Sequence, residues 1–426
     1  MAGIRAFSGL RYRDGIDLAA VTCPPYDVLS PAERSALQER SPYAAARLIL
    51  PTGEGDLRYA NAADLLEGWQ RDGVLLADPT PSLYVTRTEF TEPGSPGSAR
   101  SFRLGLVALL RLHEYADRVV LPHERTLTGP KEDRLKLLRA TQANVESIMA
   151  LVDDGDGALY AELERIAALP PVAVFDGDDH QRHSLYAVSD PATIERLTQL
   201  LAPKAVFIAD GHHRYETSVA YAKETGTLGT DAPEAFLLAT LSSFADPGLS
   251  VLPTHRMVRG TPAELRNAIF RHLEPDFDIL ENVDPKDLEG RLRVVIEDQP
   301  ILGLAMPSGT LYQLTPRDFA GMMAGLPASV HPSLRGLEAV LLQYLILEPA
   351  LGIPVAEVAT TDRIAYTRDA DYAIHQVRSG AFDMAFLLGH SAVTAVRDVA
   401  LAGEVMPQKS TFFYPKLLSG LVMRGF

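Results

Sequence analysis

A short strand that leads directly into a helix is the feature that most constrains how this chain can fold. Residues 204–210 (KAVFIAD) have the apolar composition of a buried strand, and residues 211–226 (GHHRYETSVAYAKETG) form a helical pattern that ends at Gly226. Polar residues fill the junction between the two. In α/β proteins such junctions place ligands beyond the carboxyl ends of the strands. We therefore expect a mixed α/β protein with a ligand site at this junction.

The rest of the chain alternates strand and helix patterns without an internal repeat. Residues 82–90 and a hairpin within 171–190 predict strands, and residues 364–389 predict a strand–helix–strand unit. The spacing of apolar residues predicts helices over 131–149 and 234–244. Together these patterns predict a mixed α+β architecture rather than an all-helical or all-strand one.

The chain length of 426 residues allows two or three domains. The pattern changes after Leu252-Pro253, so we place a boundary near residue 250. Residues 1–250 then form an N-terminal α/β region, and residues 251–426 form a C-terminal α/β region that includes the segment MPQKSTFFYPK.

Charge and cysteine content exclude several classes of protein. The 40 basic and 55 acidic side chains give a net charge of −15, which argues against an extended nucleic-acid surface. The single cysteine, Cys23, excludes an intrachain disulfide and a four-thiolate metal site. No run reaches the ~18 apolar residues of a membrane span, and the first residues lack the apolar core of a secretory signal. We therefore expect a soluble cytoplasmic protein without membrane contact; the sequence does not indicate its oligomeric state.

The junction Asp210-Gly211-His212-His213-Arg214 is the strongest chemical signal. Amide groups at the start of a helix, together with the helix dipole, favour an anion there. Arg214 adds a planar donor that suits phosphate, and the two histidines can donate hydrogen bonds. The alternative is structural: Asp210 caps the helix, and the histidines are solvated turn residues.

A second polar cluster follows a predicted strand at residues 122–126 (PHERT). Glu124, next to His123, has the chemistry of a general base, and Lys131 and Arg134 could neutralise phosphate charge. The alternative is the capped start of a helix, with Pro130 in its first turn.

The third cluster lies near the C-terminus, at residues 406–416 (MPQKSTFFYPK). Lys409, Ser410 and Lys416 supply ammonium and hydroxyl donors for an anion. Because the chain is acidic overall, we predict that Lys409 and Lys416 reach the site of Asp210. The alternative is an ordered tail packed through its aromatic residues.

Common nucleotide motifs are missing from the sequence: it contains no P-loop, no complete GxGxxG and no protein-kinase signature. The segment 24–28 (PPYDV) is stiffened by two prolines. Asp27 either enters a site or belongs to a rigid loop, and we favour the rigid loop.

Five motifs in order give the chain a family resemblance: PPYDV (24–28), PHERT (122–126), DGHHRYET (210–217), LPTHR (252–256) and MPQKSTFFYPK (406–416). This set resembles the family called domain of unknown function 1015. The pair PHE and DGHHR is also similar to the free-serine kinases of the ParB/sulfiredoxin-like fold.

The resemblance implies a ParB/sulfiredoxin-like core over about residues 101–245, with α/β extensions on both sides. It implies an ATP-dependent kinase that converts free L-serine to O-phospho-L-serine. Glu124 would be the base, Asp210 would orient the hydroxyl or hold Mg²⁺, and residues 211–214 would bind the phosphates. We place His123 in the same catalytic set. Apart from Asp210, the sequence identifies no metal ligand, and it leaves the phosphate donor open between ATP, ADP and another compound.

A regulatory role is the alternative. In ParB-like relatives the same loop binds a nucleotide without transferring phosphate, so the protein would act as a nucleotide-binding switch. DNA binding is disfavoured by the charge of −15. Sulfiredoxin chemistry is disfavoured because His212 replaces the loop cysteine.

Overall fold

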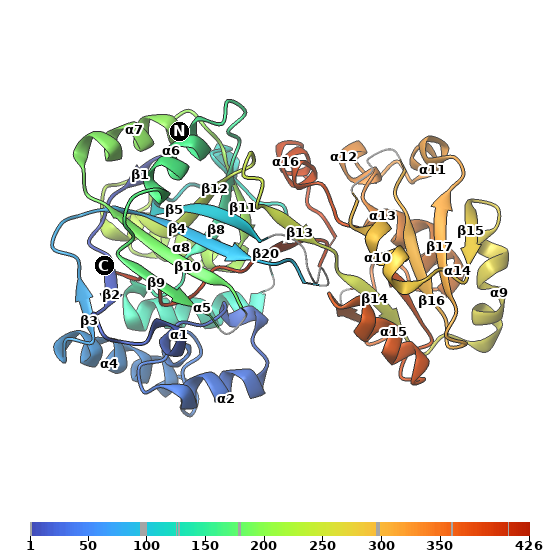
Figure 1. Ribbon diagram of the computed structural model, residues 1–426, viewed down its shortest axis with the longest axis horizontal. Helices are drawn as coiled ribbons and strands as arrows, with labels where there is room; N and C mark the ends of the chain where they lie inside the picture. Colours follow the sequence, from blue (N-terminus) through green and yellow to red (C-terminus); the bar gives the residue numbers. More distant parts are fainter. Residues whose placement is uncertain are drawn as a thin grey trace. The chain divides into compact units, whose positions relative to one another are not determined.

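The computed structural model describes residues 2–93, 100–124, 126, 128–177, 180–294, 299–358, 361–407 and 409–426. The chain forms two compact units (Figure 1). Unit 1 comprises Met1–Leu249 and Pro415–Phe426, and unit 2 comprises Ser250–Tyr414. The last residues of the chain therefore pack with unit 1, whereas our division of the sequence placed them in the C-terminal region.

Unit 1 is built on one mixed sheet with the strand order β6-β11-β8-β12-β5-β4-β10-β9, and β1 pairs with β5 outside this path. Its strands are β1 (Ile4–Arg5), β4 (Leu83–Phe90), β5 (Ser101–Arg111), β6 (Val120–Leu121), β8 (Ile148–Val152), β9 (Ala173–Asp176), β10 (Arg182–Val188), β11 (Val206–Asp210) and β12 (Phe236–Ser243). β11 is parallel to β6, and β12 is parallel to β8.

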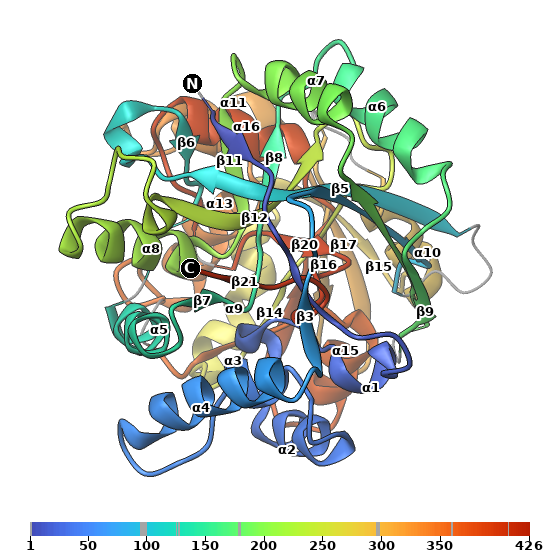
Figure 2. The ribbon, with the colours of Figure 1, turned by 90° about the vertical axis from the view of Figure 1, so that its left-hand side faces the viewer.

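The helices of unit 1 lie on both sides of this sheet, with α6 and α7 on one side and the group α1–α4 on the other (Figures 1 and 2). They are α1 (Leu18–Val21), α2 (Pro31–Arg40), α3 (Ala46–Ile49), α4 (Leu57–Arg71), α5 (Thr128–Thr141), α6 (Ala158–Ala167), α7 (Pro191–Leu201) and α8 (His212–Glu224). Short 3₁₀ turns are η1 (Tyr26–Val28), η2 (Tyr115–Asp117) and η3 (Pro233–Ala235), and two small ladders pair β2 (Leu10–Tyr12) with β3 (Leu75–Ala77) and β7 (Ala143–Asn144) with β21 (Arg424–Gly425).

Alternating residues of β5 build two parts of the unit 1 core. Leu106 and Leu110 belong to the cluster that contains the buried residues of α6 and α7. Leu109, on the opposite face, packs in a cluster with Leu421 and Val422 from the end of the chain. This two-sided burial follows from the period of two in a strand. The C-terminal segment thus forms part of the core of unit 1.

Unit 2 contains a sheet with the order β15-β17-β16-β19-β14-β18. Its strands are β14 (His255–Val258), β15 (Phe277–Glu281), β16 (Leu302–Ala305), β17 (Leu311–Pro316), β18 (Ile364–Thr367) and β19 (Met384–Leu387), and β13 (Ser250–Leu252) pairs with β20 (Phe412–Tyr414) separately. Its helices are α9 (Ala263–Leu273), α10 (Pro285–Leu292), α11 (Phe319–Gly325), α12 (Pro332–Arg335), α13 (Glu338–Leu342), the π-helical η4 (Gln343–Leu347), α14 (Glu348–Leu351), α15 (Ala370–Arg378) and α16 (Val393–Leu401).

The unit 2 sheet has a hydrophobic core on each face. Met384 and Phe386 of β19 pack with residues of α9 and α14, whereas Ala385 and Leu387 pack with residues of α10 and α15. Because successive residues of one strand enter different clusters, unit 2 has three layers, helix–sheet–helix.

The structure confirms the mixed α/β class and most of the elements predicted around the junction. β4, the β9–β10 hairpin, β11, α8 and the β18–α15–β19 unit all lie where the sequence pattern placed them.

One predicted helix was wrong, and another was predicted too long. Residues 236–243 form β12, a central strand buried on both faces, and such a strand has no apolar–polar alternation to distinguish it from a helix. The helix expected over 131–149 ends at Thr141, and the chain then pairs through β7 with β21, more than two hundred residues away. A local pattern carries no information about such a distant partner.

Candidate functional site

The parallel strands β6 and β11 bring two of the polar clusters together. Their register pairs Val120 with Val206, so both strands end at the same edge of the sheet. His123, just after β6, lies with Nδ1 2.7 Å from the carbonyl oxygen of Ile208. Its backbone N–H donates to Nε2 of His212 at 3.3 Å. The PHERT and DGHHR segments are therefore neighbours, as ligand-binding loops are at the carboxyl ends of strands.

Asp210 lies between two cations at the end of β11. Its Oδ1 is 2.6 Å from Nζ of Lys416, and its Oδ2 is 2.8 Å from Nη2 of Arg214. Burial alone would raise the pKa of Asp210, but Lys416 and Arg214 hold it well below its ordinary value. Asp210 is therefore ionised at neutral pH. The predicted approach of Lys416 to Asp210 is thus present within unit 1.

Gly211 makes the turn between β11 and α8. Its φ of +95° lies in the left-handed region, and an added Cβ would be 2.9 Å from Cγ2 of Ile148 and 3.0 Å from Cζ of Arg214. Gly211, the residue at the N-cap of α8, has no side chain that could cap the helix by a hydrogen bond. The positive end of a helix of this length, beside two cations, is electrostatically suited to an anion.

Arg214 is buried, and its guanidinium links two strand ends. Besides Asp210, it donates from Nη1 to the carbonyl oxygen of Ser147 at 2.6 Å. Within the described part of the chain, its Nε is enclosed without a hydrogen-bond partner. A buried donor of this kind is costly unless a ligand or water satisfies it.

The two histidines at the strand ends are electrically neutral. Burial lowers the pKa of His123 to about 4 and that of His212 well below its ordinary value. Their rings meet edge to face with centroids 4.8 Å apart. His123 is only 1% exposed, so it holds the two loops together rather than exchanging a proton with a ligand.

Lys131 and His213 lie beside this cluster. Nζ of Lys131 is 3.0 Å from Oε2 of Glu216, and Thr126 donates to the same oxygen at 2.7 Å. Burial lowers the pKa of His213, while the charges of Glu216 and Asp27 act to raise it. Glu216 thus holds Lys131 one turn of α8 away from the junction.

Arg134 contacts other residues of the protein on several sides. It is buried, donates to the carbonyl oxygen of Ile49 at 2.6 Å, bonds Asp133 and lies 4.2 Å from the ring centroid of Tyr26. The guanidinium of Arg134 is therefore bound to other groups of the protein. The sequence had led us to expect that it would neutralise the charge of a phosphate. Arg134 instead supports Tyr26 in the PPYDV segment.

Three further residues act near Asp210 and Arg214: Glu146 and Arg103, which were not predicted, and Asp27, which was assigned to a rigid loop. Asp27 and the buried Glu146 both raise the pKa of Arg214, and Oε1 of Glu146 accepts the N–H of Tyr26 at 3.1 Å. Arg103, buried in β5, bonds the carbonyl oxygen of Pro415 and so anchors the residue before Lys416. An arginine inside the apolar run of residues 102–110 was the one available signal for Arg103.

The remaining predicted residues have less defined surroundings. Glu124 is half-buried and follows His123 at the edge of the sheet. Lys409 is exposed, and Ser410 donates to the carbonyl oxygen of Pro407 at 2.6 Å. Because both belong to unit 2, their approach to Asp210 stays a prediction.

An apolar pocket of about 570 Å³ lies along α8, beside Lys131 and Glu216. Tyr115 and Tyr215 stack in its wall, with ring centroids 5.6 Å apart and planes inclined by 12°. Leu135, on α5, adds to the apolar lining. The pocket has the size and character of a site for a small organic group.

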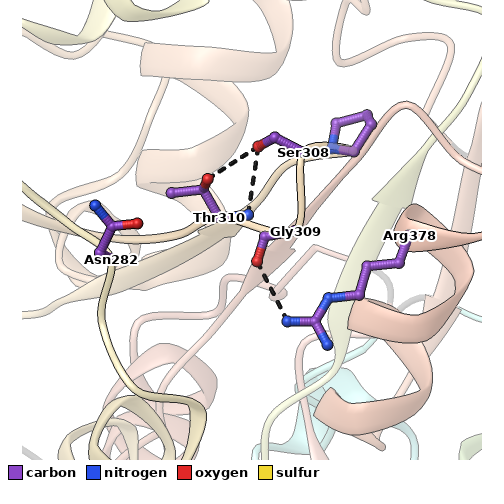
Figure 3. Close-up of a pocket in the computed structure, with 6 residues that line it drawn as sticks. Asn282, Ser308, Gly309, Thr310 and Arg378 are labelled. Atoms are coloured by element: carbon purple, nitrogen blue, oxygen red, sulfur yellow. Dashed lines mark hydrogen bonds between the residues drawn. The ribbon is translucent and has the colours of Figure 1, made fainter.

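Unit 2 contains a shallower, polar pocket of about 510 Å³ (Figure 3). It is formed by the turn between β16 and β17, where Ser308 donates to Thr310 at 3.0 Å. Arg378 already donates to the carbonyl oxygen of Gly309 at 3.2 Å, and Asn282 completes one side. The described residues that line this pocket include no carboxylate or histidine to carry acid–base chemistry.

Among the described residues, no three His, Cys, Asp or Glu side chains gather as a metal site. In the same residues, no helix combines the length and apolar character needed to cross a bilayer.

Several solved structures are similar to this chain. A free serine kinase in complex with AMP is 12% identical with a TM-score of 0.34, over 75% of this chain and 91% of that chain. A conserved hypothetical protein from Pyrococcus furiosus is 11% identical with a TM-score of 0.33, over 74% and 92%. SbnI with a C-terminal truncation, from Staphylococcus aureus, is 10% identical with a TM-score of 0.35, over 74% and 85%.

No curated protein matches the sequence. A family model does: the one described as "Protein of unknown function (DUF1015)" matches residues 4–339. Because this match spans well over half of the chain, the protein belongs to the DUF1015 family.

Proposed function

We propose that the protein is a phosphotransferase that uses ATP with Mg²⁺ to phosphorylate free L-serine. One observation carries the proposal. Asp210, Arg214 and Lys416 converge at the start of α8, where both cations contact the carboxylate. Phosphoryl transfer depends mainly on positioning and charge neutralisation, and this cluster supplies both.

In this cluster the carboxylate of Asp210 balances the charges of the two cations that would bind phosphate. Before a nucleotide binds, Asp210 neutralises Lys416 and Arg214, so the two cations are already in place. The phosphate oxygens of a nucleotide would accept hydrogen bonds from Lys416, from the buried Nε of Arg214 and from the amide groups of the Gly211–Arg214 turn. Carboxylate oxygens are the ligands that Mg²⁺ prefers, so Asp210 would hold the metal that accompanies the nucleotide.

Glu124 would remove the proton from the serine hydroxyl. The hydroxyl oxygen attacks the terminal phosphorus of ATP, the new O–P bond forms as the bond to the ADP oxygen breaks, and the proton passes to Glu124. Its place one residue after His123 supports this role, because His123 ties that loop to His212 and Ile208.

The pocket along α8 supports nucleotide binding. It adjoins Lys131, and its apolar lining with stacked tyrosines suits the base and sugar of a nucleotide.

The test is formation of O-phospho-L-serine from ATP, Mg²⁺ and L-serine. Glu124→Gln should lower turnover by ~10²–10⁴-fold with nucleotide binding retained. Asp210→Asn should abolish turnover, whereas Glu162→Gln, a substitution in α6, serves as a control away from the site. Absence of turnover with every free hydroxy amino acid would rule out the kinase. If a nucleotide still binds and Glu124→Gln has no effect, the switch without phosphotransfer is the better description.

A further inference from the structure

The LPTHR motif leads into β14, and its last two residues lie where β14 begins, between the ends of β18 and β19. β18 and β19 flank β14 and are both antiparallel to it, so they are parallel to each other and joined by α15. Their carboxyl ends lie beside the start of β14: His255 pairs with Thr367, and Nδ1 of His255 accepts the N–H of Leu388 at 3.1 Å. The start of β14 and the ends of β18 and β19 therefore bring backbone groups and polar side chains of three strands together.

Arg256 is a buried cation at this edge and is only 5% exposed. It donates from Nη1 to the carbonyl oxygen of Thr254 at 2.5 Å, and its guanidinium carbon lies 5.8 Å from the ring centroid of Tyr366. In the described residues, the other nitrogens of the guanidinium make no hydrogen bond. Burial lowers the pKa of Arg256 to about 10, a measure of how poorly its charge is compensated.

Glu338, at the start of α13, is the matching anion. Its Oε2 accepts the N–H of Gly389 at 2.7 Å, just after β19. A Cβ at position 389 would lie 2.8 Å from Oε1 of Glu338, so glycine leaves room for the carboxylate. Burial raises the pKa of Glu338 to about 7, although the Gly389 N–H and the charge of Arg256 act to lower it.

Arg256 and Glu338 influence each other electrostatically, yet within the part of the chain that the structure describes they form no ion pair. A buried arginine and a half-buried glutamate that are left apart have each lost hydration without gaining a charged partner, which is costly. A ligand that places an anion on the arginine and a cation on the glutamate would remove this cost. His255 adds a donor, because Nδ1 accepts a hydrogen bond and the proton of the neutral ring is therefore on Nε2.

We propose that unit 2 binds a free α-amino acid at this edge, with its carboxylate on Arg256 and His255 and its ammonium group on Glu338. Arginine is the preferred partner of a carboxylate, and a carboxylate that must pair an ammonium ion is the natural role for Glu338. This site belongs to unit 2 alone, and it does not depend on phosphate transfer at Asp210.

Calorimetric titration of the full chain with the standard L-amino acids at pH 8 tests the proposal. We expect at least one amino acid to bind. Arg256→Gln and Glu338→Gln should each weaken its binding tenfold or more, ~1.4 kcal/mol. Arg259→Gln, an exposed arginine just beyond the same strand, should leave binding unchanged.

Ligand analogues keep the proposal testable if Arg256→Gln does not fold. The bound amino acid without its amino group, or without its carboxylate, should bind at least tenfold more weakly to the unaltered protein. Equal binding of either analogue, no binding stronger than ~10 mM by any amino acid, or full binding by both variants would overturn the proposal. Asp210→Asn should retain amino-acid binding while it loses phosphate transfer, so failure of one proposal is distinguishable from failure of the other.

Discussion

Asp210 keeps its negative charge in a buried position because two cations from different parts of the chain contact it. Arg214 lies one helical turn away, whereas Lys416 is 206 residues further along the sequence. The need for positive charge beside the DGHHR turn allowed the contact of Lys416 to be predicted. Glu146 and Arg103 were not predictable in the same way, because a single buried charge in a sequence does not reveal which distant group it faces.

Removal of the Lys416 ammonium group should weaken nucleotide binding. In Lys416→Ala, Asp210 keeps only Arg214, and a phosphate loses one point charge. We expect the dissociation constant for ATP to rise tenfold or more, ~1.4 kcal/mol, when measured by calorimetry. Lys136→Ala is the matched control, since Lys136 is exposed on α5 and pairs with Asp56.

Equal affinity in Lys416→Ala and the unaltered protein would remove Lys416 from the phosphate site. Lys409→Ala tests the other lysine of the same motif separately, and we expect a loss of similar size. An unchanged affinity in that variant would mean that Lys409 is only a surface residue.

Burial of His123 predicts a loss of stability in mild acid. Its pKa is about 4 in the folded protein, against ~6.5 in an unfolded chain. As the pH falls, the unfolded state therefore binds a proton at this histidine before the folded state does. The contribution of His123 to the unfolding free energy is complete above pH 6.5 and is lost as the pH falls towards 4. Urea unfolding at pH 7 and pH 4.5, followed by Trp69 fluorescence, measures the change. Between pH 7 and pH 4.5, the unfolding free energy of His123→Asn should decrease less than that of the unaltered protein, by up to ~3 kcal/mol. An identical decrease in both proteins would show that His123 is not the cause.

At the scale of elements, the strand–turn–helix of β11 and α8 was the most predictable part of the fold. Its strand, turn and helix follow one another in the sequence, so the local pattern contains all the information. β12 was predicted as a helix because a fully buried strand lacks alternation, and its neighbours β5 and β8 come from elsewhere in the chain. The pairing of β7 with β21 could not be predicted either, because the two strands are far apart in the sequence.

Gly211 is the position where this element should be most sensitive to substitution. Gly211→Ala combines a left-handed backbone with contacts of 2.9 Å to Ile148 and 3.0 Å to Arg214. We expect a loss of ~1–3 kcal/mol in unfolding free energy together with weaker ATP binding, because Arg214 must move. Gly226→Ala, at the other end of α8, has a φ of +68° but no atom within 4 Å of the added Cβ. It should lose stability without losing ATP affinity, and equal effects on ATP binding would show that crowding at Gly211 is not the cause.

At the scale of the whole molecule, residues 415–426 pack with unit 1, although unit 2 lies between them and the rest of unit 1 in the sequence. Leu10 pairs with Met423 across an isolated bridge, and Arg424 donates to the carbonyl oxygen of Phe236 at 2.7 Å. The same twelve residues that carry Lys416 to Asp210 therefore also complete the hydrophobic core. Among the described residues, the hydrophobic clusters of unit 2 contain none from this segment. The position of Lys416 beside Asp210 and the folding of unit 1 are thus coupled through residues 415–426.

This arrangement predicts that a core substitution in the tail destabilises unit 1 selectively. Met423 is fully buried in the cluster that contains Trp69, which is the only tryptophan of the chain. Met423→Ala should lower the unfolding free energy of unit 1 by ~2–5 kcal/mol, the range for such cavities. Tryptophan emission reports unit 1 alone, while calorimetric melting records both units. We expect the transition seen by Trp69 to shift to lower temperature and a second calorimetric transition to stay in place. If both transitions shift together, the two cores unfold as one cooperative unit, and the tail stabilises the entire molecule.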